Sequence, residues 1–213
     1  MSAVPTGLLL AMMEPPPAME EEFQDWYDTE HFPERRDCEG FVTAGRYICI
    51  DGFPRYLALY DLADTNVLRG PDYARIAGAK YSAWTHRVIS RVWGQYRADA
   101  RQVFPGSALM GASGAASRIV LFRFRQVGPE AEAQVLAGLH NLYDGRADVA
   151  QFRLFHADQP DGTDLIAIVE MQVPTPADAS VAAAFGAAVR YLDQVNTYVP
   201  YTRRIAGSFP SST

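Results

Sequence analysis

A tyrosine and a histidine stand four residues apart in the first helical stretch of the chain, at Tyr27 and His31. In a helix this spacing places both side chains on one face, which here continues an apolar stripe from Met19 and Phe23. An imidazole transfers protons near neutral pH, and a neighbouring phenol can donate a hydrogen bond to a developing oxyanion. The spacing therefore predicts a catalytic pair facing a sheet, with His31 moving the proton. The alternative is that His31 caps the helix and Tyr27 belongs to the core.

Charged residues surround this pair. Glu30 can orient the imidazole, but sequence neighbours on a helix face different ways, so a solvated or salt-bridged carboxylate is favoured for Glu30 and Asp28. Arg35 and Arg36 follow the helix. They can bind a carboxylate substrate, although a role in satisfying the last helical carbonyls is favoured.

A further arginine, Arg46, lies inside a strand-like run. A buried guanidinium needs a charged or polar partner. Glu30, Asp61 and a substrate anion are three candidates, and the sequence leaves the choice open.

A second aromatic cluster lies near the end of the next helical stretch, at Tyr81, Trp84 and His86. Such side chains can wall an aromatic ligand, although His86 is as well explained by a surface position. The spacing does not support a metal site built from His31, His86 and a carboxylate, so we expect no metal and no cofactor. The residues predicted to bind substrate are Trp26, Glu30, Arg46, Tyr60, Tyr81, Trp84 and His86.

These residues fall in a βαββαβ order of predicted elements. The strands are expected at Thr6–Met13, Gly40–Ile50, Arg55–Leu62 and Arg87–Arg97. The helices are expected at Ala18–Phe32, where Pro33 should end the first one, and at Thr65–Thr85.

The same order recurs after a Gly, Ala and Ser-rich stretch at 104–116, which has the composition of a linker. The second set of strands is expected at Arg118–Arg125, Ala147–Ala157, Asp164–Val173 and Tyr198–Ala206. The second pair of helices is expected at Glu130–Leu142 and Asp178–Leu192, and the tail Ser208–Thr213 should be frayed. The chain thus divides into a half at 1–103 and a half at 117–213.

Both faces of the predicted strands carry apolar residues, so both faces of each sheet should be covered. Helices cover one face, and the sheet of the other half is the simplest cover for the second. The predicted fold class is therefore α+β, with two ferredoxin-like repeats whose antiparallel sheets pack into one barrel within the chain. In the second half, Leu139 and Tyr143 replace Tyr27 and His31, which predicts a single pocket in the first half.

The first half also resembles a known family. The run Trp26-Tyr27-Asp28-Thr29-Glu30-His31-Phe32-Pro33-Glu34-Arg35, followed by Gly40-Phe41, Arg46-Tyr47 and Tyr56-Leu57-Ala58-Leu59-Tyr60, is similar to the EthD-like branch of the dimeric α/β-barrel superfamily. The resemblance covers roughly residues 7–93, and Glu39 stands where relatives often have proline. It implies a pocket between the helices and the sheet of one half. Because members include isomerases, cyclases, dehydratases, cofactor-free monooxygenases and haem-dependent enzymes, it does not imply one reaction.

Composition narrows the class of partner. The 213 residues carry a net charge of −6, which argues against a general nucleic-acid binder and against docking on anionic membranes. The apolar run at residues 7–13 is too short for a signal sequence, and Cys38 and Cys49 fit no metal or disulfide spacing, so a cytoplasmic location is expected. The expected partner is a small-molecule substrate. The internal pseudo-dimer leaves further homodimerisation open.

The favoured function is an enzyme that moves a proton on a small aromatic or carbonyl-containing metabolite without a cofactor. A cofactor-free monooxygenase of the quinone-forming kind is the second hypothesis. A non-catalytic protein that binds a small molecule is the third.

Overall fold

The computed structural model describes residues 6–112, 114–174, 181–201 and 203, and eight strands form one closed antiparallel barrel. The strand order around it is β1-β3-β2-β8-β5-β7-β6-β4. Each half contributes four neighbouring strands, and the pairs β2–β8 and β4–β6 join the halves. The strands are β1 (Gly7–Glu14), β2 (Gly45–Asp51), β3 (Tyr56–Leu62), β4 (Trp93–Phe104), β5 (Arg118–Phe124), β6 (Val149–Gln159), β7 (Gly162–Met171) and β8 (Leu192–Pro200).

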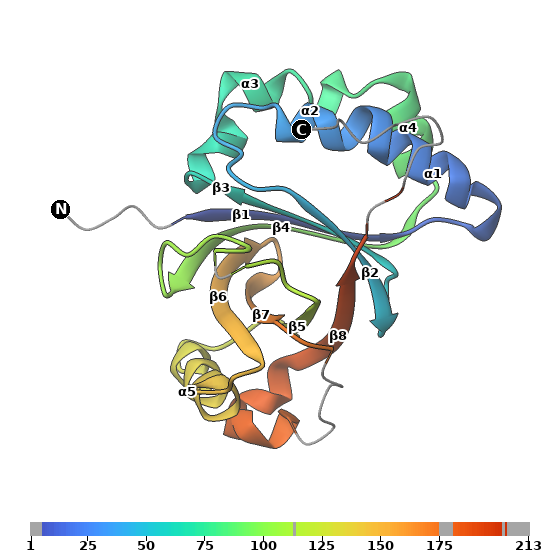
Figure 1. The fold of residues 1–213 in the computed structure, drawn as a ribbon. Coiled ribbons are helices and arrows are strands. Elements are labelled where there is room, and N and C mark those ends of the chain that lie inside the picture. The colour runs from blue at the N-terminus through green and yellow to red at the C-terminus, as the bar shows by residue number, and fades with distance from the viewer. Residues whose placement is uncertain (1–5, 113, 175–180, 202, 204–213) are drawn as a thin grey trace.

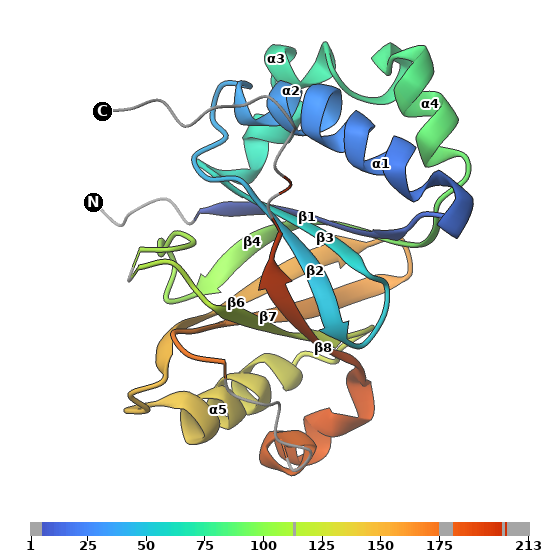
Figure 2. The same ribbon diagram turned by 45° about the vertical axis from the view of Figure 1, so that its right-hand side comes forward.

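Helices cover the outside of the barrel on two opposite sides (Figure 1). On the first half lie α1 (Glu20–Trp26), η2 (Tyr27–His31), α2 (Phe32–Arg36), η3 (Thr65–Arg69), α3 (Pro71–Ala74), η4 (Gly78–Lys80) and α4 (Ala83–Ile89), with a short turn η1 (Pro17–Met19) before them. On the second half lie α5 (Ala131–Tyr143) and η5 (Val181–Tyr191). The turned view in Figure 2 shows the resulting layers, helices outside two sheets that face each other. No helix within the described residues is long and apolar enough to cross a membrane.

The barrel interior explains why both faces of the strands are apolar. Alternate residues of β1 and β3, such as Leu8, Leu10 and Leu59, point inward and meet Phe155 and Ile166 from the other half. The remaining apolar residues of each sheet pack under that half's own helices. Burying a side chain of this size contributes about 1.5–3 kcal/mol to the free energy of folding. Exposing the inner sheet face of either half to water would therefore be strongly unfavourable. The predicted α+β barrel of two ferredoxin-like halves is confirmed.

Two predicted strands are misplaced. Arg87 and Ile89 belong to α4, because the Ser82 hydroxyl accepts a hydrogen bond from the Thr85 amide and starts a helix there. The strand that follows starts at Trp93 and includes Phe104, which the sequence assigns to the linker.

The last strand also comes earlier than expected, since β8 begins at Leu192. The expected helix before it is a 3-10 segment with a kink at Gly186. The predicted helix start at Asp178 and the tail Ser208–Thr213 lie outside the described residues.

An ion triad is buried inside the barrel. Arg153 of β6 places Nη1 2.7 Å from Asp61 of β3 and Nη2 3.2 Å from Glu170 of β7. All three side chains are almost completely buried, and Asp61 also accepts from the Thr43 hydroxyl. The triad ties the first half to the second by a charged contact as well as by apolar packing.

Candidate active site

The first helical layer is interrupted at the candidate site. Between α1 and α2 the helix widens into a π-turn, η2, in which the Phe32 amide donates to the Tyr27 carbonyl. Pro33 has no amide hydrogen for the Thr29 carbonyl, which lowers the cost of leaving the regular pattern here. The prediction that Pro33 ends the helix is wrong, because the proline lies in the first turn of α2 and the helix continues to Arg36. Single π-turns of this kind are frequent at functional sites.

Under this turn lies a cavity of about 130 Å³, between the helices and the sheet of the first half. This is the place that the family resemblance implies. Its walls combine apolar residues of β1 with a dense set of polar and aromatic side chains. The polar and aromatic lining residues are Tyr27, His31, Arg35, Tyr60, Tyr73, Tyr81, Gln95, Tyr96 and Arg97.

His31 is 6% exposed and lines this cavity. Its ring packs on Trp26, with centroids 4.0 Å apart, and lies edge-on to Tyr27 at 5.2 Å. Burial, reinforced by the positive charges of Arg35 and Arg46, holds the pKa of His31 well below its ordinary value of 6.5. The imidazole is therefore neutral at neutral pH. Its Nδ1 atom is buried and has no hydrogen-bond partner in the described part of the chain.

Two phenols share the cavity with His31. Tyr27 is 2% exposed and Tyr60 is 1% exposed. Burial raises the pKa of both, against the lowering effect of Arg35 and Arg46, so each keeps its proton and can donate it in a hydrogen bond. The Tyr60 hydroxyl makes no hydrogen bond of good geometry within the described residues, but it interacts with the Tyr27 phenol, and this interaction contributes to the pKa shifts of both groups.

Arg35 lies deeper than the sequence suggests. Its Nη1 donates to the His31 carbonyl at 3.2 Å, which is the helix-end role that the sequence favours. The side chain is nevertheless almost completely buried and also lines the cavity. The sequence does not identify Arg97, Tyr73, Gln95 and Tyr96 as lining residues, because the predicted strand starts too early and the segment predicted as one helix at Thr65–Thr85 is divided among η3, α3, η4 and the start of α4.

Glu30 and Trp26 stabilise the site through hydrogen bonds with residues at the start of α4. Glu30 accepts hydrogen bonds from the hydroxyls of Ser82, at 2.5 Å, and Thr85, at 3.0 Å. Trp26 Nε1 donates to the same Thr85 oxygen at 2.9 Å. These contacts attach α1 and η2 to α4, and neither Trp26 nor Glu30 lines the cavity.

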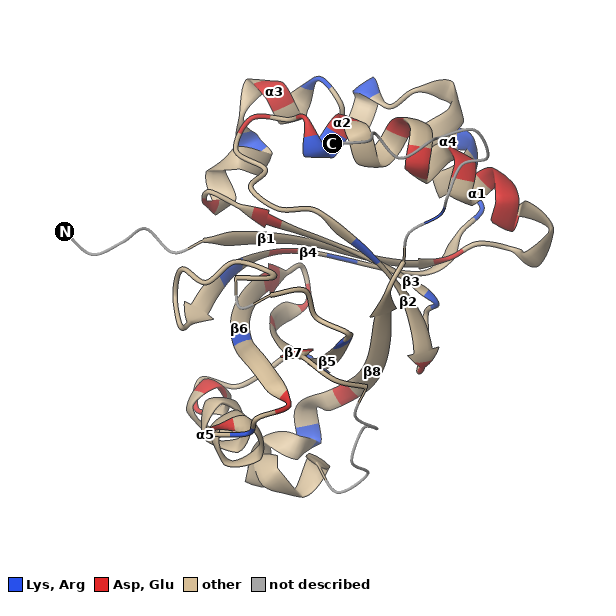
Figure 3. Cartoon of the chain, in the orientation of Figure 1, with Lys and Arg blue, Asp and Glu red and all other residues tan. Residues whose placement is uncertain are grey.

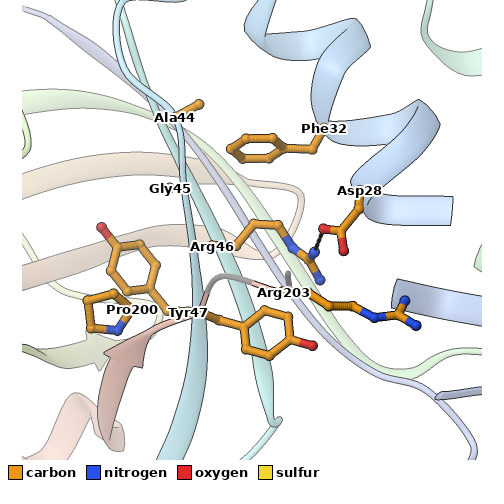
Figure 4. Close-up of a pocket in the computed structure, with 9 residues that line it drawn as sticks. Asp28, Phe32, Ala44, Gly45, Arg46, Tyr47, Pro200 and Arg203 are labelled. Atoms are coloured by element: carbon orange, nitrogen blue, oxygen red, sulfur yellow. Dashed lines mark hydrogen bonds and ion pairs between the residues drawn. The ribbon is translucent and has the colours of Figure 1, made fainter. Parts of the chain in front are cut away.

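Arg46 lies on the other side of Tyr27. Its guanidinium contacts the side chains of Asp28 and Gln24 and lies 4.3 Å from the centre of the Tyr27 ring. The charged partner of Arg46 is therefore Asp28, and not Glu30 or Asp61. Arg46 lines an open cleft of about 440 Å³ between η2 and β2, as Figure 4 shows. Tyr201 is also a lining residue of this cleft. Arg46 and Tyr27 thus separate the open cleft from the more enclosed cavity under η2 (the closed cavity).

The three residues of the second aromatic cluster lie in different environments. Tyr81 lines the closed cavity, with its ring centre 6.5 Å from that of His31. Trp84 is half-buried against the helix-sheet core, and His86 is exposed and does not line the cavity. Within the described residues, no group of three or more His, Cys, Asp or Glu side chains could hold a metal ion.

The corresponding space in the second half is filled. Leu139 and Tyr143, the counterparts of Tyr27 and His31, pack in the core between α5 and the sheet. Phe122 and Phe185 pack beside them, with ring centres 5.4 Å apart. Acidic and basic residues are interspersed on the helices of both halves, as Figure 3 shows. The distribution of charge on the helices therefore does not distinguish one half from the other.

No family model matches the sequence, and no curated protein matches it. Solved structures do match the fold. An anthrone oxidase-like protein superposes with a TM-score of 0.60 at 15% identity, covering 100% of this chain and 98% of that one. A candidate monooxygenase from Lactobacillus acidophilus NCFM gives 0.54 at 10% identity, over 92% and 94% of the two chains.

A chlorite dismutase mutant from Candidatus Nitrospira defluvii gives a TM-score of 0.55 at 10% identity, over 92% of this chain and 91% of that one. At such identities these likenesses establish architecture and not activity. The chain thus has an α+β fold in which two ferredoxin-like halves form one closed barrel within a single polypeptide.

Proposed function

We propose that this protein is an enzyme that moves a proton on a small aromatic or carbonyl-containing substrate bound in the closed cavity, without a cofactor. One observation carries the proposal: a neutral, buried His31 lines the cavity together with two protonated phenols, and its Nδ1 atom has no hydrogen-bond partner within the described residues. A neutral imidazole can accept a proton, and buried polar atoms without a partner in a native protein call for an explanation.

The roles follow from the protonation states. His31 takes a proton from the substrate and returns it at another atom, as in an isomerase, lyase or cyclase. Tyr60 or Tyr27 donates a hydrogen bond to the oxygen on which negative charge develops. The motif around His31 supports membership of the EthD-like family. We also propose that the chain divides functionally at residues 104–116, with the site in the first half and the second half as its partner in an internal pseudo-dimer.

Cofactor-free oxygenation is a second candidate. It is favoured by the names of two structural neighbours, an anthrone oxidase-like protein and a candidate monooxygenase. The first step is shared, because removing a proton from a phenol or an enolisable carbon gives the electron-rich anion that dioxygen can oxidise. The two candidates differ in whether dioxygen is consumed.

The test is proton exchange in deuterated water. We expect the protein to catalyse exchange of the acidic C–H protons in at least one member of a panel of small aryl ketones and phenols, followed by NMR. His31→Gln should slow this exchange by about 100-fold or more. His140→Gln is the matched control, since His140 lies half-exposed on α5 of the second half. An oxygen electrode on the same mixtures separates oxygenation, and equal rates for the two variants would overturn the role of His31.

A further inference from the structure

The closed cavity has an uneven charge. Among its lining residues in the described part of the chain, two are arginines, Arg35 and Arg97, and none is an aspartate or glutamate. A cavity of this kind favours an anionic occupant, since low polarity strengthens the interaction between a fixed cation and a ligand charge.

Arg35 is the deeper of the two and is weakly neutralised. Within the described residues its guanidinium makes three hydrogen bonds, at 3.2 Å to the His31 carbonyl, 3.3 Å to Glu34 and 3.5 Å to the Ile76 carbonyl. Glu34 is the only carboxylate among them, and about one third of its side chain is exposed. Arg153, equally buried, instead has a fully buried carboxylate at 2.7 Å. The Arg35 guanidinium therefore retains capacity for a close carboxylate, which its planar donor geometry matches.

Arg97 lies nearer the solvent. Half of its side chain is exposed, and it is already paired with Asp99 at 2.8 Å and with the Tyr73 hydroxyl at 3.3 Å. An exposed pair of this kind is weak, so Arg97 attracts an anion toward the cavity more than it anchors one. The anchoring group is Arg35.

The size and walls of the cavity limit the rest of the ligand. A volume of about 130 Å³ is close to the ~150 Å³ engineered cavity that binds one benzene molecule. The rings of Tyr27, Tyr60, Tyr73 and Tyr81 surround it, and aromatic faces and edges pack favourably on an aromatic ring.

We infer that the substrate is a single-ring aromatic carboxylate whose carboxyl group binds Arg35; this inference rests on the proposed function. A bound carboxylate would also offset the Arg35 charge that disfavours protonated His31. Binding would then make His31 a stronger base at the moment when a proton must be taken, and the complex would take up protons that the free protein does not.

The experiment compares two probes of the same shape, benzoate and benzamide, by isothermal titration calorimetry on the full chain. We expect benzoate to bind at least about tenfold more tightly than benzamide, with proton uptake at pH 6–7 revealed by repeating the titration in two buffers. Arg35→Met should remove this preference, so that benzoate and benzamide bind with similar affinity. Arg36→Met is the matched control, because Arg36 is exposed and paired with Asp37, and it should retain the preference.

The comparison of benzoate with benzamide on the wild-type protein needs no variant. It therefore tests the inference even if Arg35→Met fails to fold. Equal affinity for both probes, binding of neither at about 10 mM, or a preference that survives in Arg35→Met would overturn the inference. These outcomes are independent of the His31 test. If His31→Gln loses proton exchange and the wild type shows no preference for benzoate, the proposed function stands and the inference about the carboxylate fails. If the wild type prefers benzoate and His31→Gln exchanges protons at the wild-type rate, the protein binds carboxylates but the proposed function fails.

Discussion

The indole ring of Trp26 packs against the imidazole ring of His31 with their centroids 4.0 Å apart. The same indole donates its N–H to Thr85, 59 residues further along the chain. The candidate catalytic ring is therefore held in place from α4, through Trp26, and not by the carboxylate that precedes it in the sequence. A rigid support of this kind keeps a proton-transfer group within reach of its substrate.

Removing this support should affect both stability and activity. Thr85→Val leaves the Trp26 N–H without its acceptor, so we expect a loss of about 1–3 kcal/mol in the free energy of unfolding, measured by urea denaturation. We also expect slower proton exchange, since His31 loses its fixed backing. Ser90→Ala, at the exposed end of α4, is the control and should change neither quantity. A Thr85→Val protein with wild-type stability would contradict this account of the network.

The buried imidazole predicts a pH dependence of stability. Above pH 6.5, His31 is neutral in both the folded and the unfolded chain and contributes nothing. As the pH falls below this value, the unfolded chain gains a proton that the folded chain does not bind, so the free energy of unfolding falls by up to about 1.4 kcal/mol per pH unit. The fall ends near the lowered pKa of the folded state.

His31→Gln should remove this component. We expect the difference in unfolding free energy between pH 7.5 and 5.5, measured in urea, to be smaller in the variant than in the wild type. His140→Gln serves again as the control for the loss of a histidine. The same slope in wild type and His31→Gln would show that the imidazole titrates normally in the folded protein.

Tyr60 predicts opposite effects on stability and activity. In the described part of the chain its buried hydroxyl interacts with the Tyr27 phenol but makes no hydrogen bond of good geometry, so Tyr60→Phe removes a poorly satisfied group from the core. We expect the midpoint of thermal unfolding to stay constant or rise, while proton exchange slows by about 10- to 100-fold. A variant that is less stable and fully active would mean that the hydroxyl is structural.

The ion triad predicts a different pattern. Arg153→Met leaves Asp61 and Glu170 buried without their shared cation, and we expect a loss of about 3–5 kcal/mol in unfolding free energy at pH 7. The loss should be smaller at pH 5, because Glu170 without its cation can then be protonated. Burial already raises the pKa of Glu170 in the intact protein.

Arg36→Met is again the control, since the Arg36–Asp37 pair is exposed and its removal should not measurably change stability. A similarly small effect for Arg153→Met would show that packing alone joins the two halves.

The sequence by itself determined the order of the elements, the two halves and the barrel. Apolar residues on both faces of the strands can be satisfied only by helices on one side and a second sheet on the other. It also placed Tyr27 and His31 on one helical face, because that relationship depends on local spacing. The register of these local patterns survives even where the helix widens into a π-turn.

Only the tertiary structure decided which groups meet. Arg46 pairs with Asp28 rather than with Glu30 or Asp61, and Glu30 accepts hydrogen bonds from α4 rather than orienting His31. Arg35 reaches the cavity as well as the helix end. These outcomes depend on contacts between segments distant in the chain, and on burial, which sets the protonation state of His31. Neither the contacts between distant segments nor the burial of a side chain can be read from the periodicity of a single segment.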